Sequence, residues 1–140
     1  MALQVNKSEV VEQVRAVFTE YERALIDNDV RTMNTLFWSA PESVRYGIAD
    51  IQHGGAAICT WRANCQPVSP QRQIHHTIIT TFGTDFATVS TEFTDDNDSS
   101  RHGRQMQTWA RLGPISDMDN GWKIVAAHVS LVSSIQCVKT

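Results

Sequence analysis

Apolar residues recur at helical spacing near the start of the chain. Steps of four, three, four and four residues separate Val10, Val14, Val17, Tyr21 and Leu25. This spacing places all of them on one face of a helix that ends near Asp27. Asn6 or Ser8 can cap its first turn, and Glu9 lies at capping-box spacing from Asn6. We therefore expect one long amphipathic helix whose apolar face is buried.

Two shorter helices and a strand follow. Asp29 caps the second helix, whose inward-facing residues are Met33, Leu36 and Phe37. Residues 43–48 predict a short strand. A third helix, which carries Trp61 beside apolar neighbours on a core face, begins after Gly54 and ends near Cys65, ahead of two prolines.

The second half of the chain predicts four strands, at residues 73–82, 86–94, 101–112 and 121–132. Gly83-Thr84-Asp85 and Asp119-Asn120-Gly121 have the composition of tight turns. Short turns between successive strands indicate antiparallel pairing. We expect an α+β fold in which three N-terminal helices pack on a curled antiparallel sheet, so that helices and sheet enclose a cone with an open mouth.

Two of these strands have polar side chains on a face that is expected to be apolar. Side chains two apart share a face of a strand, so one face is predicted to hold Gln105, Gln107 and Trp109, and the facing set is Trp122, Ile124, Ala126, His128 and Ser130. The intervening residues Val125, Ala127, Val129 and Leu131 are apolar as well. A strand covered on both faces predicts a pocket wall, and the alternative is an amphipathic hairpin with its glutamines in water.

Composition narrows the class of protein. The chain has 140 residues, of which 41% are apolar and 19% are charged, with a net charge of −3. This is typical of one globular domain over residues 1–140. The absence of a basic run argues against nucleic acid or an anionic membrane surface as partner. No stretch reaches the roughly 18 apolar residues of a membrane span, and the first residues lack the apolar region of a signal peptide.

Cysteine and histidine patterns also exclude several kinds of site. Cys59, Cys65 and Cys137 are odd in number and form no CxxC motif, which indicates the reduced cytoplasm. His75 and His76 are adjacent, so in a strand they point to opposite faces and cannot chelate one metal. There is no metal-ligand spacing, phosphate loop, dinucleotide fingerprint or Gly-x-Ser-x-Gly elbow. We expect no metal and no cofactor.

Segments spread over most of the chain together resemble a known family. They are Tyr21-Glu22-Arg23-Ala24-Leu25, Leu36-Phe37-Trp38, Val44-Arg45-Tyr46-Gly47, Thr80-Thr81-Phe82-Gly83, Asp85-Phe86-Ala87-Thr88, Gly103-Arg104-Gln105, Gln107-Thr108-Trp109 and the ending Gly-Trp-Lys-Ile-Val-Ala-Ala-His-Val-Ser at residues 121–130. The order and the ending resemble the NTF2-like (SnoaL-like, cystatin-like) superfamily. The tripeptides resemble, within it, the AtzH-like family, which includes the HpxZ oxalurate-catabolism proteins. Met106 and the long loop 112–120 depart from the family pattern.

The resemblance implies an activity and two central residues. In the AtzH branch the activity is a decarboxylating amidohydrolase reaction that converts 1,3-dicarboxyurea to allophanate during cyanuric acid or ureide catabolism, in functional association with an amidase. The important residues are a tyrosine of the first helix and an arginine of the first strand. Those roles carry over to Tyr21 and Arg45 as catalytic residues.

The residue types of this pair allow the same interpretation and a simpler one. Tyr21 lies in the apolar stripe, so its buried hydroxyl needs a partner, which is either a ligand or a backbone carbonyl. Arg45, between Val44 and Tyr46, lies either on the surface or inside. An inward guanidinium needs a carboxylate to offset its desolvation and would therefore predict an anionic ligand, bound in bidentate fashion.

We expect the pocket to be lined by Tyr21 and Arg45 together with the substrate-binding residues Trp38, Gln105, Gln107, Trp109 and His128. One rival function is a non-catalytic anion-binding or assembly module. Another is an isomerase or dehydratase of the ketosteroid-isomerase kind, which needs a carboxylate base inside the cone, and Glu92 is the nearest candidate. Arg104 is predicted on the opposite face of the sheet. An outer face made of Val125, Ala127, Val129 and Leu131 predicts a homodimer.

Overall fold

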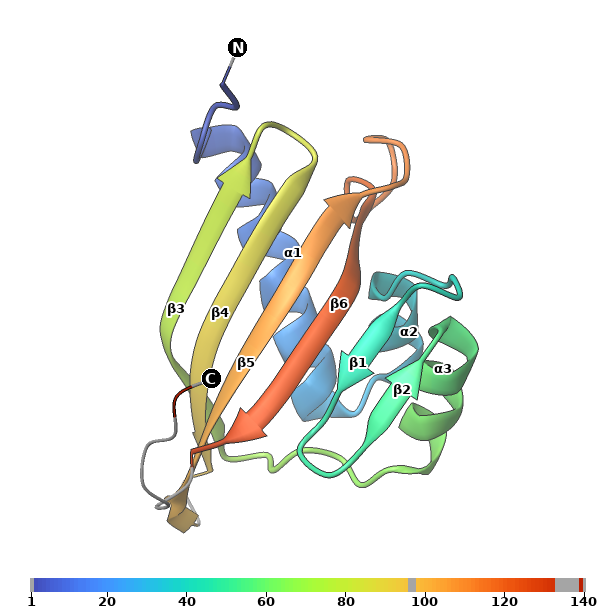
Figure 1. Cartoon of the computed structure of the whole chain (residues 1–140), viewed down its shortest axis with the longest axis vertical. Helices are drawn as coiled ribbons and strands as arrows, with labels where there is room; N and C mark the ends of the chain where they lie inside the picture. Colours follow the sequence, from blue (N-terminus) through green and yellow to red (C-terminus); the bar gives the residue numbers. More distant parts are fainter. Residues whose placement is uncertain (1, 96–97, 133–138, 140) are drawn as a thin grey trace.

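The computed structural model describes residues 2–95, 98–132 and 139, with the backbone alone at 98–101. The helices are α1 (Ser8–Asp27), α2 (Val30–Leu36) and α3 (Gly55–Asn64), and the strands are β1 (Val44–Tyr46), β2 (Ile51–His53), β3 (Arg72–Phe82), β4 (Phe86–Asp95), β5 (Asp98–Arg111) and β6 (Trp122–Leu131) (Figure 1). The predicted α+β class and the three helices on a curled sheet are confirmed. The boundaries of the long elements agree with the sequence patterns to within a few residues.

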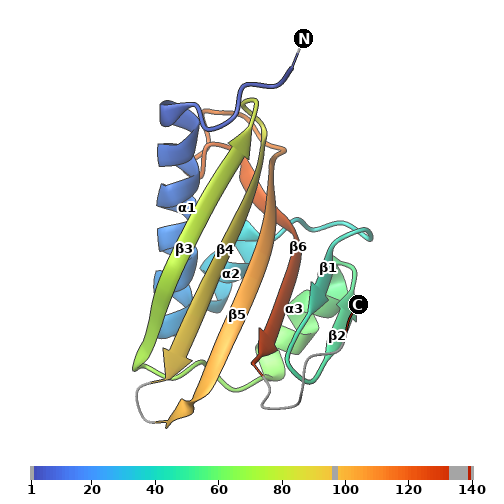
Figure 2. The ribbon, with the colours of Figure 1, turned by 60° about the vertical axis from the view of Figure 1, so that its left-hand side comes forward.

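The six strands form one sheet in the order β2-β1-β6-β5-β4-β3. The long strands β3 to β6 pair antiparallel, as their short connections require. The helices lie on one side of the sheet, with α1 running along the long strands (Figure 2). Among the residues that the structure describes, no helix covers the other side of the sheet, and a space is enclosed between α1, α3 and the inner face of the sheet.

The stripe on α1 is buried as its spacing predicts. Val14 is fully buried, and Val10, Val17 and Tyr21 are at most 5% exposed. The start of the helix differs from the prediction, because Lys7 occupies the N-cap position without a side-chain hydrogen bond. Asn6 instead pairs with Thr81 of β3, its side-chain Oδ1 accepting from the Thr81 amide at 2.9 Å. The capping prediction was wrong because this contact to a distant strand takes the side chain that would have capped the helix.

The cap of α2 agrees with the sequence. Asp29 Oδ1 accepts from the backbone amide of Thr32 at 3.1 Å, the hydrogen bond that an N-cap aspartate makes. Asp29 also binds Arg23, and the hydrogen bonds from Arg23 and Thr32 lower the pKa of this carboxyl to about 2. Met33, Leu36 and Phe37 are buried, as their spacing predicts.

The predicted strand at 43–48 is β1, the first strand of a small hairpin whose second strand is β2. β1 pairs antiparallel with β2, and its other edge pairs parallel with β6. The Gly47 amide donates to the Asp50 carbonyl at 2.9 Å and closes the turn between β1 and β2. The sheet is therefore mixed rather than purely antiparallel. The sequence pattern missed β2, a strand of three residues.

A bulge in β6 changes which of its side chains face inward. Thr108 pairs with Ala126, but Trp109 pairs with Ile124, so Val125 is an extra residue in the ladder. Such a bulge shifts the alternation of side chains by one position. Before it, Trp122 and Ile124 face inward, and after it the inward positions are Ala127, Val129 and Leu131.

Two predictions about β6 are corrected by this bulge. His128 is exposed on the outer face, where its ring packs edge-on against Tyr46 with 5.7 Å between ring centroids. Ala127, Val129 and Leu131 line the interior rather than the outer face. The strict alternation assumed from the sequence fails because it cannot include an extra residue at Val125.

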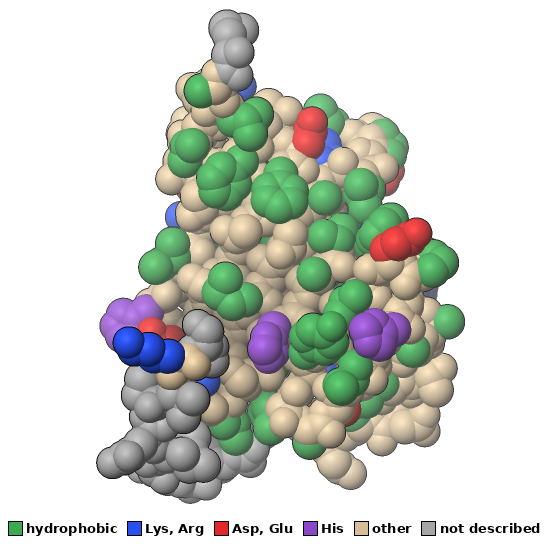
Figure 3. Space-filling view, in the orientation of Figure 1, with side chains coloured by type: hydrophobic (Ala, Val, Ile, Leu, Met, Phe, Trp, Pro, Cys, Tyr) green, Lys and Arg blue, Asp and Glu red, His purple; other side chains and the backbone are tan. Residues whose placement is uncertain are grey.

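The outer face of the sheet is nevertheless apolar, through other residues. Its exposed hydrophobic side chains are Tyr46, Ile51, Ile78, Phe86 and Met106. Figure 3 shows this side of the molecule as scattered green apolar side chains with histidines among them. Arg104 lies on this face, as predicted from its phase, and donates to the Ser130 hydroxyl.

Within the described residues, no helix is long and apolar enough to cross a membrane. Cys59 is exposed and Cys65 is half-buried, and both are free thiols. Cys137 lies outside the described residues.

Candidate functional site

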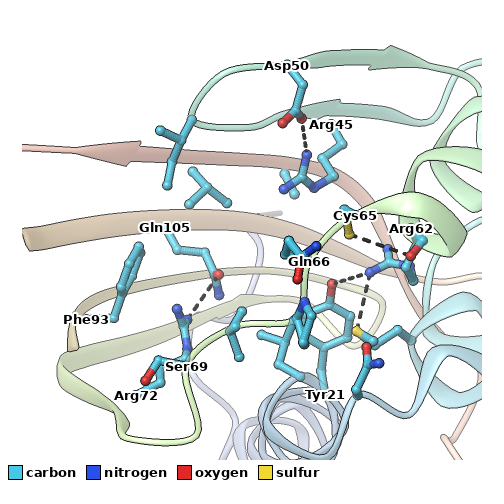
Figure 4. A pocket seen from close by; sticks show the side chains of 18 of the residues that line it. Tyr21, Arg45, Asp50, Arg62, Cys65, Gln66, Ser69, Arg72, Phe93 and Gln105 are labelled. Atoms are coloured by element: carbon cyan, nitrogen blue, oxygen red, sulfur yellow. Dashed lines mark hydrogen bonds and ion pairs between the residues drawn. The ribbon is translucent and has the colours of Figure 1, made fainter. Parts of the chain in front are cut away.

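A cavity of about 340 Å³ lies between the helices and the inner face of the sheet. This volume is at the small end of the range for small-molecule sites, about 300–1,000 Å³. Polar side chains reach it from α1, β1, α3, β3 and β5, and the connection between α3 and β3 passes over it (Figure 4). The polar and aromatic residues on which the argument depends are Tyr21, Arg45, Trp61, Arg62, Gln105 and Gln107.

Tyr21 enters the cavity from the buried stripe of α1. Its side chain is buried, and its ring packs on Phe37 with 5.9 Å between centroids. The phenol oxygen accepts a hydrogen bond from Arg62 Nη1 at 3.3 Å. Because arginine can only donate, the phenol hydrogen must point elsewhere, and no described residue accepts it. Tyr21 can therefore donate to a ligand in the cavity.

Arg45 reaches the cavity from the inward position of β1. Its Nη1 donates to Asp50 Oδ1 at 2.6 Å and to Gln52 Oε1 at 2.9 Å, and its guanidinium lies 3.5 Å from the centre of a Trp61 ring. Burial lowers the pKa of Arg45, the hydrogen bond to Asp50 opposes that effect, and the positive charge of Arg62 adds a smaller decrease. The sequence allowed Arg45 to lie on the surface or inside, and the structure places it inside. Its carboxylate partner, however, is Asp50 of the same chain, so Arg45 alone does not require an anionic ligand.

Arg62 is a site residue that sequence reasoning missed. It is only 4% exposed. Its Nε donates to Asn34 Oδ1 at 3.0 Å and its Nη1 also contacts Met33 Sδ, while the buried Nη2 has no hydrogen-bond partner. No carboxylate of the described residues forms an ion pair with it. The signal in the sequence was its spacing of four from Ile58 on α3, because a helix places such residues on the same face and Ile58 is buried.

Arg62 brings into the cavity a positive charge for which the described residues show no ion pair. Arg45 is paired with Asp50, and Arg72 is paired with Glu22 at 2.9 Å. A buried charge is stable only when it is paired and hydrogen-bonded. The arrangement therefore favours an anion in the cavity, next to the Tyr21 hydroxyl.

Gln105 and Gln107 lie in the cavity wall on the inner face of β5, as their alternation predicts. Gln105 Oε1 accepts from Arg72 Nη2 at 3.3 Å, and Gln107 Oε1 accepts from the Trp109 indole nitrogen at 3.0 Å. Trp109 itself is fully buried behind the wall. Trp109 does not line the cavity, so the prediction that it contacts the substrate was wrong. Its indole nitrogen instead orients the Gln107 amide.

Two other predicted residues lie outside the cavity. Trp38 lines a separate shallow hollow with Asn34, Thr35 and Lys123. The chain is extended here, and the Trp38 amide donates to the Ile124 carbonyl at 2.9 Å. Neighbouring side chains therefore point in opposite directions, and Phe37 takes the side facing the cavity. His128 is on the outer face for the reason given above. Trp61, predicted as a core residue, instead lines the cavity below Arg45.

The carboxylate considered for an isomerase lies away from the cavity. Glu92 is half-buried and accepts from His102 Nε2 at 2.9 Å. That hydrogen bond, with a smaller contribution from His76, lowers the pKa of Glu92. The part of the chain that the structure describes has no cluster of three or more histidine, cysteine or acidic residues that could hold a metal ion.

Comparison with known proteins agrees with this architecture. A cystatin-like fold protein from Burkholderia xenovorans LB400 is 60% identical, with coverage of 95% of this chain and 99% of that one and a TM-score of 0.87. A protein of the DUF3225 family from Pectobacterium atrosepticum is 41% identical, with coverage of 92% and 95% and a TM-score of 0.83. An NTF2-like superfamily protein from Salmonella enterica serovar Typhimurium is 17% identical, with coverage of 92% and 95% and a TM-score of 0.67. That last likeness shows the fold alone.

No curated protein matches the chain. The family model that matches is AtzH-like, over residues 3–134. This match spans every helix and strand of the structure, including α1 with Tyr21, β1 with Arg45 and the whole lining of the cavity. The chain therefore belongs to the AtzH-like family and has a cystatin-like fold, which it shares with NTF2-like proteins.

Proposed function

We propose that the protein is a decarboxylating amidohydrolase that acts on a small carboxylated urea such as 1,3-dicarboxyurea and releases allophanate. Membership of the AtzH-like family supports this reaction class. The observation that carries the proposal is the buried Arg62, which has no carboxylate partner and lies against the Tyr21 hydroxyl. A carboxylated urea supplies the missing negative charge and an atom for Tyr21 to protonate.

The reaction needs a proton donor more than it needs a nucleophile. When the bond between nitrogen and the carboxylate carbon breaks, the electron pair stays on the nitrogen, which must take up a proton, and the carboxylate leaves as carbon dioxide. Tyr21 gives this proton and regains one from solvent. Arg62 donates to the phenol oxygen and stabilises the charge that develops there.

Arg45 holds a carboxylate of the substrate and fixes its orientation. Asp50 and Gln52 both accept from the same nitrogen, Nη1. The guanidinium plane is held against Trp61, so the remaining nitrogens keep a fixed direction. Such positioning lowers the barrier by keeping the reacting groups aligned.

The direct test is turnover of freshly prepared 1,3-dicarboxyurea, with release of carbon dioxide and formation of allophanate measured together. Allophanate is itself an amide, so an amidase is the class of enzyme that would consume the product. Binding of dicarboxyurea without turnover would instead support a non-catalytic anion-binding module. For a ketosteroid-isomerase-like reaction, Glu92 lies outside the cavity, and Asp50 in the cavity lining is paired with Arg45.

Arg45→Lys is expected to raise KM and lower kcat, with a combined loss in kcat/KM of about tenfold or more, because lysine keeps the charge but loses the planar fork. Steady-state kinetics measure both constants. The matched control is Arg104→Lys on the outer face, where the guanidinium donates to Ser130 and no effect on either constant is expected. Equal constants for Arg45→Lys and the wild type would contradict the role of Arg45.

We also propose that the protein is a homodimer joined through the outer face of the sheet. Two rows of outer side chains cross five strands, Ile78, Ser90, Met106, His128 and Tyr46 in one and Thr80, Thr88, Thr108, Ala126 and Val44 in the other. Neither row holds a lysine, arginine, aspartate or glutamate. A two-fold axis sets a surface against its own copy, so a surface of apolar and small polar side chains without Lys, Arg, Asp or Glu suits a second copy of this chain.

Met106→Glu is expected to convert the dimer to a monomer, because it would bring like charges together at the centre of the interface. Met106 is 54% exposed in the single chain. Light scattering at micromolar concentration measures the mass. Met118→Glu, in a fully exposed turn, serves as control and should remain dimeric. A monomeric wild type would refute this proposal.

A further inference from the structure

The wall of the cavity formed by β5 offers hydrogen-bond donors. Gln105 and Gln107 are 5% and 3% exposed. The oxygen of each amide is already bound, in Gln105 by Arg72 and in Gln107 by Trp109. Guanidinium and indole nitrogens can only donate, so neither amide can turn its oxygen into the cavity without breaking that bond.

The amide nitrogens are left for a ligand. Gln105 Nε2 is buried and has no hydrogen-bond partner. Within the part of the chain that the structure describes, no residue accepts from Gln107 Nε2 either. Arg72 is itself held by an ion pair with Glu22 and by the Phe93 ring, whose centre lies 4.2 Å from the guanidinium. These contacts fix Arg72, and Arg72 in turn fixes the orientation of the Gln105 amide. Figure 4 shows Gln105 and Arg72 on the side of the cavity away from Arg62.

We propose that Gln105 and Gln107 form a second acceptor-binding subsite, which makes the cavity selective for ligands with a carboxylate at both ends. One carboxylate lies at Arg45, Arg62 and Tyr21, and the other takes the N–H donors of the two amides. A ligand that ends in an amide NH₂ group at this subsite places donor against donor and leaves buried groups unpaired.

This selectivity adds a substrate preference to the proposed function. It rests on that proposal, because the expected length of the ligand is that of dicarboxyurea. Loss of carbon dioxide converts one end of dicarboxyurea from an acceptor into an NH₂ donor. A product that turns this new end toward Gln105 and Gln107 loses its hydrogen bonds there. In the productive orientation the new NH₂ group forms at Tyr21, so the subsite keeps the carboxylate that the reaction leaves in place and separates diacid from monoamide.

The test uses glutarate and its monoamide, glutaramate, as unreactive analogues with the skeletal length of dicarboxyurea. Calorimetry with the wild-type protein is expected to show glutarate binding roughly tenfold or more tighter than glutaramate, because the amide loses charge-assisted hydrogen bonds. Equal affinities, or no binding of either compound, would overturn the proposal.

The decisive variant is Gln105→Glu, which replaces the donor NH₂ by a carboxylate oxygen while Arg72 pairs with the new charge. It is expected to abolish the preference for glutarate. Gln13→Glu is the matched control, since Gln13 Oε1 also accepts from an arginine and a tryptophan, Arg111 and Trp122, outside the cavity. It should keep the preference of the wild type.

Gln105→Leu provides a second variant that removes the amide without adding charge, and it should also lose the preference. Retention of the preference in both Gln105 variants would overturn the subsite. The outcome is separable from that of the proposed function. Turnover of dicarboxyurea without a glutarate preference would refute the subsite alone, whereas a preference without turnover would refute the reaction alone.

Discussion

Replacing Tyr21 with phenylalanine is expected to lower kcat for 1,3-dicarboxyurea by roughly a hundredfold or more, the range lost when a general acid is removed. The substitution keeps the ring and its packing against Phe37. It removes only the hydroxyl, whose oxygen accepts from Arg62 and whose hydrogen is available for the substrate. KM should change little, because the carboxylate-binding groups remain.

The same variant tests whether the loss is chemical or structural. Glutarate should still bind to Tyr21→Phe, and thermal unfolding should stay cooperative. Tyr46→Phe is a suitable control, since Tyr46 lies on the outer face and should leave kcat unchanged. Full activity of Tyr21→Phe would eliminate the proposed proton donor.

Arg62→Met is expected to separate function from stability. It removes the unbalanced charge at the site, so kcat/KM should fall by about tenfold to a hundredfold, the range for a hydrogen bond to a charged group. The stability of the ligand-free protein should stay within about 1 kcal/mol of the wild type or rise, because an unpaired buried charge is replaced by an apolar side chain. Denaturant unfolding with and without glutarate measures both effects.

Arg72→Met supplies the contrast, because Arg72 is a buried arginine with a carboxylate partner. Its removal leaves Glu22 buried without that partner, and the expected loss of stability is about 3–5 kcal/mol. If Arg62→Met destabilised the ligand-free protein as much as Arg72→Met, Arg62 would be a structural residue. The argument for an anionic ligand would then fail.

The main elements of the fold could be predicted because they depend on local periodicity. The stripe from Val10 to Leu25 specifies α1, and Asp29 caps α2 through a hydrogen bond within a single turn. The glutamines of β5 face inward because the alternation there has no interruption between Gln105 and Trp109. These features need only neighbours a few residues apart, which the order of residues specifies.

The details of the site depend on contacts between distant segments, which only the tertiary structure decides. The bulge at Val125 moves His128 to the outer face and brings Ala127 inward, although nothing in the spacing of the chain marks it. Arg45 meets Asp50 because a small hairpin turns between them. The Arg62 guanidinium reaches Tyr21 across 41 residues of sequence. The sequence by itself determined the family, the helices and the inward glutamines, whereas the placement of the Arg62 charge in the cavity was decided by the packing of α3 against α2, β1 and β2.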